Sequence, residues 1–188
     1  MSGLEAVAVA FGVVSVWLTV RQNPWCWPLG MVNVALFAVL FWRERLYADA
    51  GLQIVYVVVC AYGWWAWLRG GPGAGPLPVS RAPRRASLFL LTAGVLLAAV
   101  LGLTLKRATD AALPFWDAGT TAFSLVAQGM QARKWLENWI LWIVVDVVYV
   151  GMYLTKGLHL TAGLYAVFVG LAGFGLREWT RAVRGSAG

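Results

Sequence analysis

Long apolar runs dominate the chain, and short segments with charge, glycine or proline separate them. Within the runs the apolar positions do not alternate with polar ones, as they would in half-buried strands. The runs are comparable to the roughly 20 residues that a helix needs to cross a bilayer. The pattern therefore predicts seven membrane-spanning helices. Their predicted ranges are Gly3 to Val20, Pro28 to Trp42, Leu46 to Leu68, Ser87 to Leu105, Asp117 to Ala132, Trp135 to Thr155 and Leu158 to Trp179.

The composition supports a membrane protein. Of 188 residues, 61% are hydrophobic and 12% are charged, whereas about 25% are charged in a soluble domain. Seven crossings leave loops too short for a separate soluble domain. We therefore exclude a water-soluble enzyme and expect one all-α integral membrane domain, with any binding inside the helix bundle or at its edge.

The net charge of +7 reports orientation rather than a nucleic-acid partner, because Lys and Arg lie almost entirely between the apolar runs. Alternating crossings place ten of the fifteen cations on one side. The positive-inside rule makes that side cytoplasmic, so we expect the N-terminus outside and the C-terminus inside. The ten are Arg21, Arg69, Arg81, Arg84, Arg85, Arg133, Lys134, Arg177, Arg181 and Arg184.

The two halves of the chain resemble each other at a constant offset of 112 positions. Trp27 matches Trp139, and LYADAGLQIVY from Leu46 lies over LHLTAGLYAVF from Leu158. A unit of three helices begins and ends on opposite sides of the membrane. A copy with the same orientation therefore needs one additional crossing, which the run from Ser87 to Leu105 supplies. We predict a parallel 3+1+3 repeat.

The predicted organisation has three parts. Residues 1–69 form the first three-helix repeat, residues 70–110 a basic linker with the central helix, and residues 111–188 the second repeat with a short cytoplasmic tail. The segment from Gly70 to Arg85 is rich in Gly and Pro, which is typical of a flexible connection. Parallel repeats are a transporter architecture with the substrate site between the repeats near the membrane midplane. The repeat therefore favours transport.

One helix of the second half carries an aromatic stripe around a carboxylate. Spacings of three and four residues place these side chains on one helix face: Trp139, Trp142, Asp146, Tyr149 and Tyr153. A carboxylate at bilayer depth is costly and marks either a functional cavity or a pairing partner on a neighbouring helix. Both interpretations of Asp146 stay open, and the aromatic residues are either substrate contacts or interfacial anchors.

The preceding helix has a polar stripe that includes Ser124 and Gln128, whereas the matching positions of the first half are mostly apolar. We therefore expect an asymmetric site dominated by the second half. Interhelical hydrogen bonding is the alternative interpretation of this stripe. The first half contributes a smaller polar set, of which Asn33, Gln53 and Tyr56 are the candidates for substrate contact.

These side chains indicate the chemistry of a ligand. Amides and hydroxyls suit ribose-like hydroxyl groups, and aromatic faces suit a flat ring, especially a cationic one. The sequence contains no nucleophile elbow, no zinc-protease motif and no Walker loop. Its two cysteines have no metal-ligand spacing. We expect no catalytic residue, no metal and no cofactor.

Three segments resemble the PnuC family of bacterial vitamin transporters, most closely its nicotinamide riboside members. They are WPLGMVNVALF from Trp27, LYADAGLQIVYVV from Leu46 and ARKWLENWILWIVVDVVYVGMYL from Ala132. The resemblance implies a SWEET-like fold of seven helices, a homotrimer and a location in the bacterial inner membrane as a multi-pass protein. It also implies facilitated diffusion, with trapping of the substrate by a cytoplasmic kinase.

On this resemblance we expect a nicotinamide riboside uniporter that works by alternating access. The residues expected around the pyridinium ring are Trp142, Tyr149 and Trp139. Those expected to hydrogen-bond the ribose and carboxamide are Gln128, Asn33 and Gln53. Asp146 either balances the ring charge or braces the helices. Thiamine or riboflavin, which related members are implied to carry, is the alternative substrate.

Two functions of other classes compete with transport. A membrane enzyme acting on lipid needs a catalytic constellation, and its activity would vanish when Asp146 is replaced. A non-transporting receptor or assembly subunit binds its ligand without moving it, and would more naturally carry a soluble signalling domain. Neither has a motif in this sequence to support it.

Overall fold

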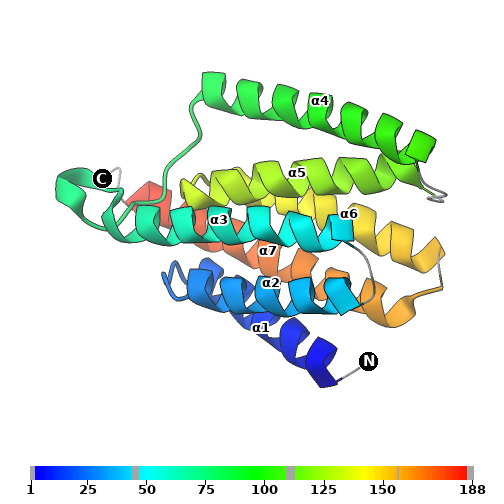
Figure 1. Cartoon of the computed structure of the whole chain (residues 1–188). Coiled ribbons are helices and arrows are strands. Elements are labelled where there is room, and N and C mark those ends of the chain that lie inside the picture. The colour runs from blue at the N-terminus through cyan, green and yellow to red at the C-terminus, as the bar shows by residue number, and fades with distance from the viewer. Residues whose placement is uncertain (1–2, 44–46, 109–112, 156, 186–188) are drawn as a thin grey trace. The chain divides into compact units, whose positions relative to one another are not determined.

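The computed structural model describes residues 3–43, 47–108, 113–155 and 157–185, and these residues form helices joined by short connections (Figure 1). One short 3₁₀ turn, η1 (Pro72–Ala74), accompanies the α-helices. In the described part of the chain the α-helices are α1 (Gly3–Val20), α2 (Cys26–Arg43), α3 (Tyr47–Arg69), α4 (Arg84–Ala108), α5 (Pro114–Ala132), α6 (Asn138–Thr155) and α7 (His159–Gly185). The all-α prediction is confirmed for these residues.

Each apolar run coincides with a helix, but several ends differ from the predicted ones. Helix α4 begins at Arg84, three residues early, because Pro83 can occupy the entrance of a helix and its carbonyl accepts from Ser87 N at 2.9 Å. Helix α6 begins at Asn138, three residues late, because the chain turns at Lys134 with φ of 51°. The predicted start at Leu46 lies outside the described residues.

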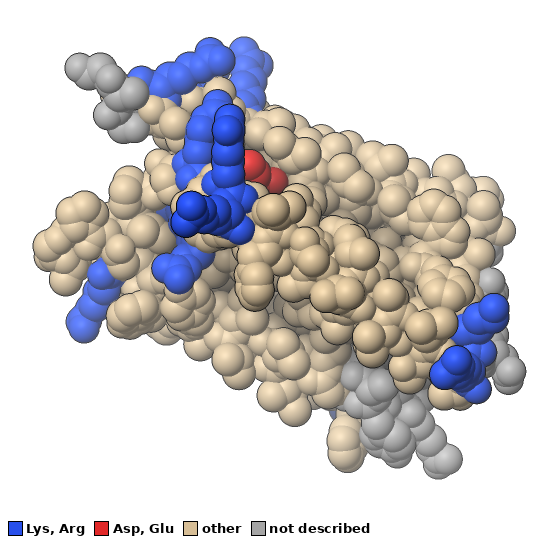
Figure 2. Space-filling model, turned by 90° about the horizontal axis from the view of Figure 1, so that it is seen from above, with Lys and Arg blue, Asp and Glu red and all other residues tan. Residues whose placement is uncertain are grey.

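Four helices of the described chain are long and apolar enough to cross a membrane: α4, α6, α7 and the part of α3 from Gly51 to Arg69. Helices α1 and α2 contain shorter apolar segments, Val7–Val20 and Cys26–Leu40. Large apolar side chains are exposed on these helices. Leu88 and Phe89 of α4, for example, are 68% and 71% exposed. Such surfaces need hydrocarbon or protein to cover them. Figure 2 shows broad uncharged areas with Lys and Arg gathered away from them.

The chain forms two compact units. One consists of Met1–Pro78 with Ala132–Lys134, and the other of Val79–Gln131 with Trp135–Gly188. In the first unit α2 packs against both α1 and α3, and in the second α6 packs against α7. Helix α4 approaches α5 through Gly94, near Phe123 and Val126, and through Gly102, near Phe115. The three-part division at residues 69 and 110 stays a prediction, and residue 110 lies outside the described residues.

Each unit has a pair of buried tryptophans at its core. Trp27 meets Trp67 edge to face with ring centroids 5.4 Å apart, and Trp139 meets Trp179 in the same way at 5.3 Å. A glycine makes room for each pair, because an added Cβ at Gly63 or at Gly175 would lie 2.5 Å from the first tryptophan of its pair. The three residues of one set lie 112 positions from those of the other. The repeated sequence therefore builds the same local packing in each unit.

The connection between α3 and α4 is held by hydrogen bonds. In the first unit Leu77 N donates to Trp67 O at 3.0 Å. In the second, Ala82 N donates to the Glu137 carboxylate at 2.8 Å, and Leu136 N donates to Ser80 O at 2.9 Å. Backbone and side-chain partners from distant sequence therefore hold residues 77–82, and the flexibility of the linker stays a prediction.

Candidate functional site

The polar stripe of α5 meets the aromatic stripe of α6 in the second unit. Trp142 Nε1 of α6 donates a hydrogen bond to Gln131 Oε1 of α5 at 3.1 Å. Trp142 remains half-buried, so its indole is fixed at one edge while part of its surface stays accessible. An accessible indole held in one orientation is the type of group that stacks on a flat or cationic ring.

Asp146 lies one turn after Trp142 and is only 6% exposed. The described residues show no ion pair or hydrogen bond to its carboxylate, while Tyr165 of α7 lies near enough to interact with it electrostatically. A carboxylate in this position needs a compensating partner, because an ionised group without one is costly to bury. The pairing interpretation of Asp146 therefore has no cation to support it among the described residues of the second unit.

Three tyrosines form a cluster beside Asp146. The Tyr149 and Tyr165 rings lie 4.6 Å apart, and Tyr153 stacks on Tyr165 at 5.3 Å. Phe168 extends the cluster with an edge contact to Tyr165 at 5.9 Å. The sequence analysis selected Tyr149 but missed Tyr165 and Phe168.

A signal for the missed residues was present in the internal repeat. Tyr165 and Phe168 lie 112 positions after Gln53 and Tyr56, two candidates of the first half. Projecting the candidates of each half onto the other would have found them. The repeat therefore places aromatic side chains on α7 at the positions where α3 has an amide and a phenol.

The remaining candidates of the second unit lie in different surroundings. Ser124 is buried and donates to Thr121 O at 2.8 Å, and Gln128 is half-buried on the same helix. Trp139 is 2% exposed and packs in the core against Trp179. The structure thus brings Trp142, Asp146 and Tyr149 together on α6 and places Trp139 in the helix packing. A binding role of Trp139 stays a prediction.

The first-unit candidates include one with an evident packing role. Asn33 Nδ2 of α2 donates to Ala8 O of α1 at 2.7 Å, which joins these two helices. Gln53 and Tyr56 are half-buried on α3. Their contribution to a binding site stays a prediction.

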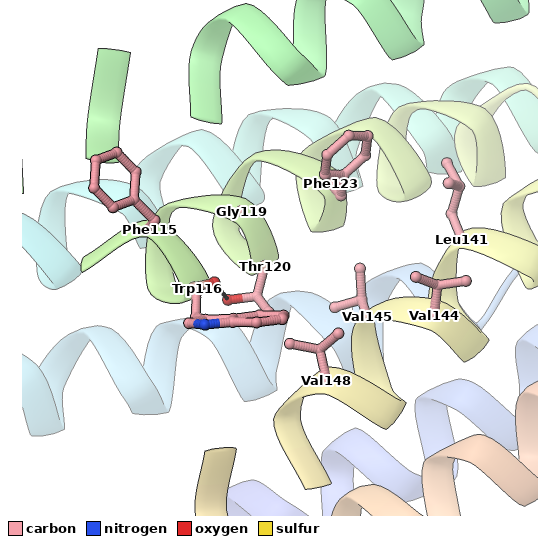
Figure 3. Close-up of a pocket in the computed structure, with 9 residues that line it drawn as sticks. All are labelled: Phe115, Trp116, Gly119, Thr120, Phe123, Leu141, Val144, Val145 and Val148. Carbon is pink, nitrogen blue, oxygen red and sulfur yellow. Dashed lines mark hydrogen bonds between the residues drawn. The ribbon is translucent and has the colours of Figure 1, made fainter. Parts of the chain in front are cut away.

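A cavity of about 340 Å³ lies between α5 and α6 (Figure 3). Its walls are almost entirely apolar, and none of the nine predicted site residues lines it. The hydroxyl of Thr120 in the wall is directed to carbonyl groups of its own helix, those of Trp116 and Asp117, each at 3.0 Å. The cavity therefore offers little to a polar solute. Among the described residues no cluster of His, Cys, Asp and Glu could hold a metal ion.

Lys134 is a buried cation that the sequence pattern did not single out. It lies in the turn between α5 and α6, is 5% exposed, and places its ammonium 4.5 Å from the centre of the Trp67 ring within the first unit. Burial lowers the pKa of Lys134 to about 8. Gln22, the residue 112 positions earlier, has the same left-handed backbone, with φ of 56° against 51°.

The stability of the protein should therefore depend on the protonation of Lys134. An unfolded lysine keeps its proton up to a pKa of 10.5, whereas the folded one loses it near 8. The unfolded state binds more protons between these values. Deprotonation of Lys134 therefore removes the cost of burying its charge, and the free energy of unfolding rises as pH increases from 8 to 10.5. We expect the melting temperature of wild type to rise over this range relative to Lys134→Met. The neighbouring Arg133→Met should show no such trend, and a constant difference between wild type and Lys134→Met would contradict the assignment.

Comparison with known proteins identifies relatives over nearly the whole chain. Residues 2–181 match the profile of a family described as nicotinamide mononucleotide transporter. The nicotinamide riboside transporter PnuC of Escherichia coli K12 is 27% identical, with 98% of this chain and 87% of the relative covered. The riboflavin/roseoflavin transporter RibM of Streptomyces davaonensis is 28% identical, with 93% and 83% covered.

The fold has a counterpart among solved structures. The crystal structure of the vitamin B3 transporter PnuC matches with a TM-score of 0.75 at 25% identity. The match covers 97% of this chain and 83% of that one. The likeness in fold therefore extends over the same length as the likeness in sequence.

Proposed function

The chain belongs to the nicotinamide mononucleotide transporter family, which includes PnuC, and we propose on this premise that it carries nicotinamide riboside across the membrane. That it is a membrane transporter of a small vitamin-like solute, and not an enzyme, follows from its relatives and its fold. The riboside itself is the finer assignment, and it rests on the chemistry of the site in the second unit.

The observation that carries this proposal is the grouping of a half-buried Trp142, a buried Asp146 and a half-buried Tyr149 on α6. Nicotinamide riboside has a flat pyridinium cation, which suits an indole face beside a buried carboxylate without a cation partner among the described residues. Its ribose hydroxyls and carboxamide need amide and hydroxyl partners. The partners that we propose on α5 are Gln128 and Ser124, and those that we propose in the first unit are Asn33, Gln53 and Tyr56.

The transport mode proposed is facilitated diffusion by alternating access. Seven crossings in a parallel 3+1+3 arrangement, with the N-terminus outside and the C-terminus in the cytoplasm, would let two similar units rock around one site. The matching tryptophan pairs of the two units support this duplication. A cytoplasmic kinase would trap the riboside by phosphorylation, and the protein would act as a homotrimer in a bacterial inner membrane.

Riboflavin is the second candidate substrate, because RibM is as similar to this chain as PnuC is. Riboflavin is flat and hydroxylated but carries no ring cation. Asp146 therefore distinguishes the two substrates. Asp146→Asn should weaken the binding of a cationic ring and leave that of riboflavin nearly unchanged.

Uptake by purified protein in vesicles tests the proposal. Nicotinamide riboside, thiamine and riboflavin are offered in parallel, with and without a proton gradient. We expect the riboside to saturate at the lowest concentration, to equilibrate without accumulating, and to be insensitive to the gradient. If riboflavin or thiamine saturates uptake at a lower concentration, the assignment of the riboside as substrate is wrong. Accumulation driven by the proton gradient would contradict uniport.

A further inference from the structure

The cavity between α5 and α6 occurs where the two repeats differ in their helix contacts. In the first unit Asn33 ties α2 to Ala8 of α1, and Gly12 of α1 allows close approach, since an added Cβ there would lie 3.2 Å from the Asn33 amide nitrogen. In the second unit the residues 112 positions later are Val145, Thr120 and Ser124. Valine cannot donate a hydrogen bond, and serine has the Cβ that glycine lacks.

The cavity follows from these substitutions. Val145 and Thr120, which replace the hydrogen-bonded pair of the first unit, both line it. The hydrogen bond that closes the contact between α1 and α2 has no equivalent at these two positions. The second repeat thus has a space of about 340 Å³ at the positions where, in the first repeat, Asn33 donates a hydrogen bond to Ala8 O.

The cavity opens to the surface that hydrocarbon covers. Its wall residues Phe115, Trp116 and Val144 are 50%, 57% and 55% exposed. The adjoining helices α4 and α6 are both long and apolar enough to span a bilayer. An apolar space that opens to a bilayer is filled by lipid or protein, because the atoms that line an empty space lose dispersion contacts.

Two cations lie beyond one end of the cavity. Phe115, in its wall, packs against Gly102 of α4, and Lys106 follows one helical turn later, about 6 Å along the axis. Lys106 and Arg107 form the basic last turn of α4, and both are exposed. An apolar slot with cations past its end matches a lipid with an anionic headgroup.

We propose that the cavity binds one acyl chain of an anionic phospholipid, whose phosphate lies against Lys106 and Arg107. The acyl chain fills the space that Val145 and Thr120 leave between α5 and α6. The bound lipid thus packs between α5 and α6, at the positions equivalent to those where Asn33 joins α2 to α1. This inference requires the membrane location of the family and is independent of which vitamin is carried.

Photo-crosslinking in vesicles tests this site. The full chain is reconstituted into phosphatidylcholine containing phosphatidylglycerol with a photoreactive group in its acyl chain, and labelled peptides are mapped. We expect labelling of residues 115–123 and 141–148 to exceed that of Leu88 and Phe89, which report general contact with lipid. Replacing Lys106 and Arg107 by glutamine should remove the preference for phosphatidylglycerol over a phosphatidylcholine probe.

A matched pair of glycine variants makes the test specific. Gly119 lines the cavity and Gly129 lies on the same helix away from it, and an added Cβ meets nothing within 4 Å at either position. Gly119→Leu should lower labelling of the cavity about tenfold, because its side chain occupies the space of the acyl chain. Gly129→Leu should leave labelling unchanged, and labelling of α4 should persist in both.

Three results would overturn the proposal. Labelling that is the same in Gly119→Leu and wild type would place the lipid elsewhere. Suppression of labelling by excess nicotinamide riboside would assign the cavity to the transported solute. Cross-links from the cavity residues to a second copy of the chain, lost in Gly119→Leu, would make it a subunit interface.

Discussion

Alanine at Gly63 or at Gly175 is expected to destabilise the protein by about 1–3 kcal/mol, the usual cost of overpacking a core. An added Cβ would lie 2.5 Å from ring carbons of Trp27 in the first unit and of Trp139 in the second. Both indoles are almost fully buried, and each is fixed by a second tryptophan. Neither ring can move aside without disturbing that pair.

The chain provides its own control for this result. Gly51 and Gly163 are also separated by 112 positions and lie in α3 and α7, the helices of Gly63 and Gly175, but an added Cβ meets nothing within 4 Å there. Alanine at these positions should be neutral or stabilising, since it is the better helix former by about 1 kcal/mol. Thermal unfolding in detergent, followed by circular dichroism, measures all four variants. Equal melting temperatures for the Gly51 and Gly63 variants would contradict the packing described here.

The variant Trp142→Ala is expected to weaken binding of nicotinamide riboside by about 1–2 kcal/mol, the range for a desolvated cation–π face. This loss corresponds to an increase of about 5- to 30-fold in the dissociation constant. The reason is that Trp142 is held in one orientation by Gln131 while part of its ring stays accessible. Titration calorimetry on purified protein measures binding separately from transport.

Two further variants separate the ring face from its support. Trp142→Phe keeps an aromatic face but loses the donor to Gln131, so it should bind with intermediate affinity. Trp65→Ala removes an exposed tryptophan of α3, 56% of whose surface is accessible, and should affect membrane insertion more than binding. Equal losses of affinity from Trp142→Ala and Trp65→Ala would argue against this site.

The aromatic stripe of α6 shows what residue spacing alone can predict about a helix face. Intervals of three and four residues correctly placed Trp142, Asp146 and Tyr149 on one face. The same intervals included Trp139, which lies in the core against Gly175 and Trp179. A stripe covers a wide arc of a helix, so one edge can contact a neighbouring helix while the other stays accessible. Periodicity contains no information about which neighbour covers which edge.

Other features required contacts between residues far apart in sequence. Tyr165 joins the tyrosine cluster because α7 packs on α6, and only the internal repeat marks it in the sequence. Glu137 lies in the segment from Ala132 that resembles the PnuC family, and in the structure its carboxylate accepts the backbone N–H of Ala82. Lys134 is buried because its turn packs on Trp67. In each case the partner lies many residues away.

The amino-acid sequence alone was sufficient to identify a helical membrane protein with two similar halves. Hydrophobicity and run length are local properties of the chain, and they located the described helices with ends at most six residues from the observed ones. Contacts between helices were needed to show that Trp27 and Trp139 are core residues whereas Trp142 remains accessible, and to find the cavity between α5 and α6. Those outcomes depend on the side chain that faces each residue from another helix, and one glycine or one asparagine at that position is enough to reverse them.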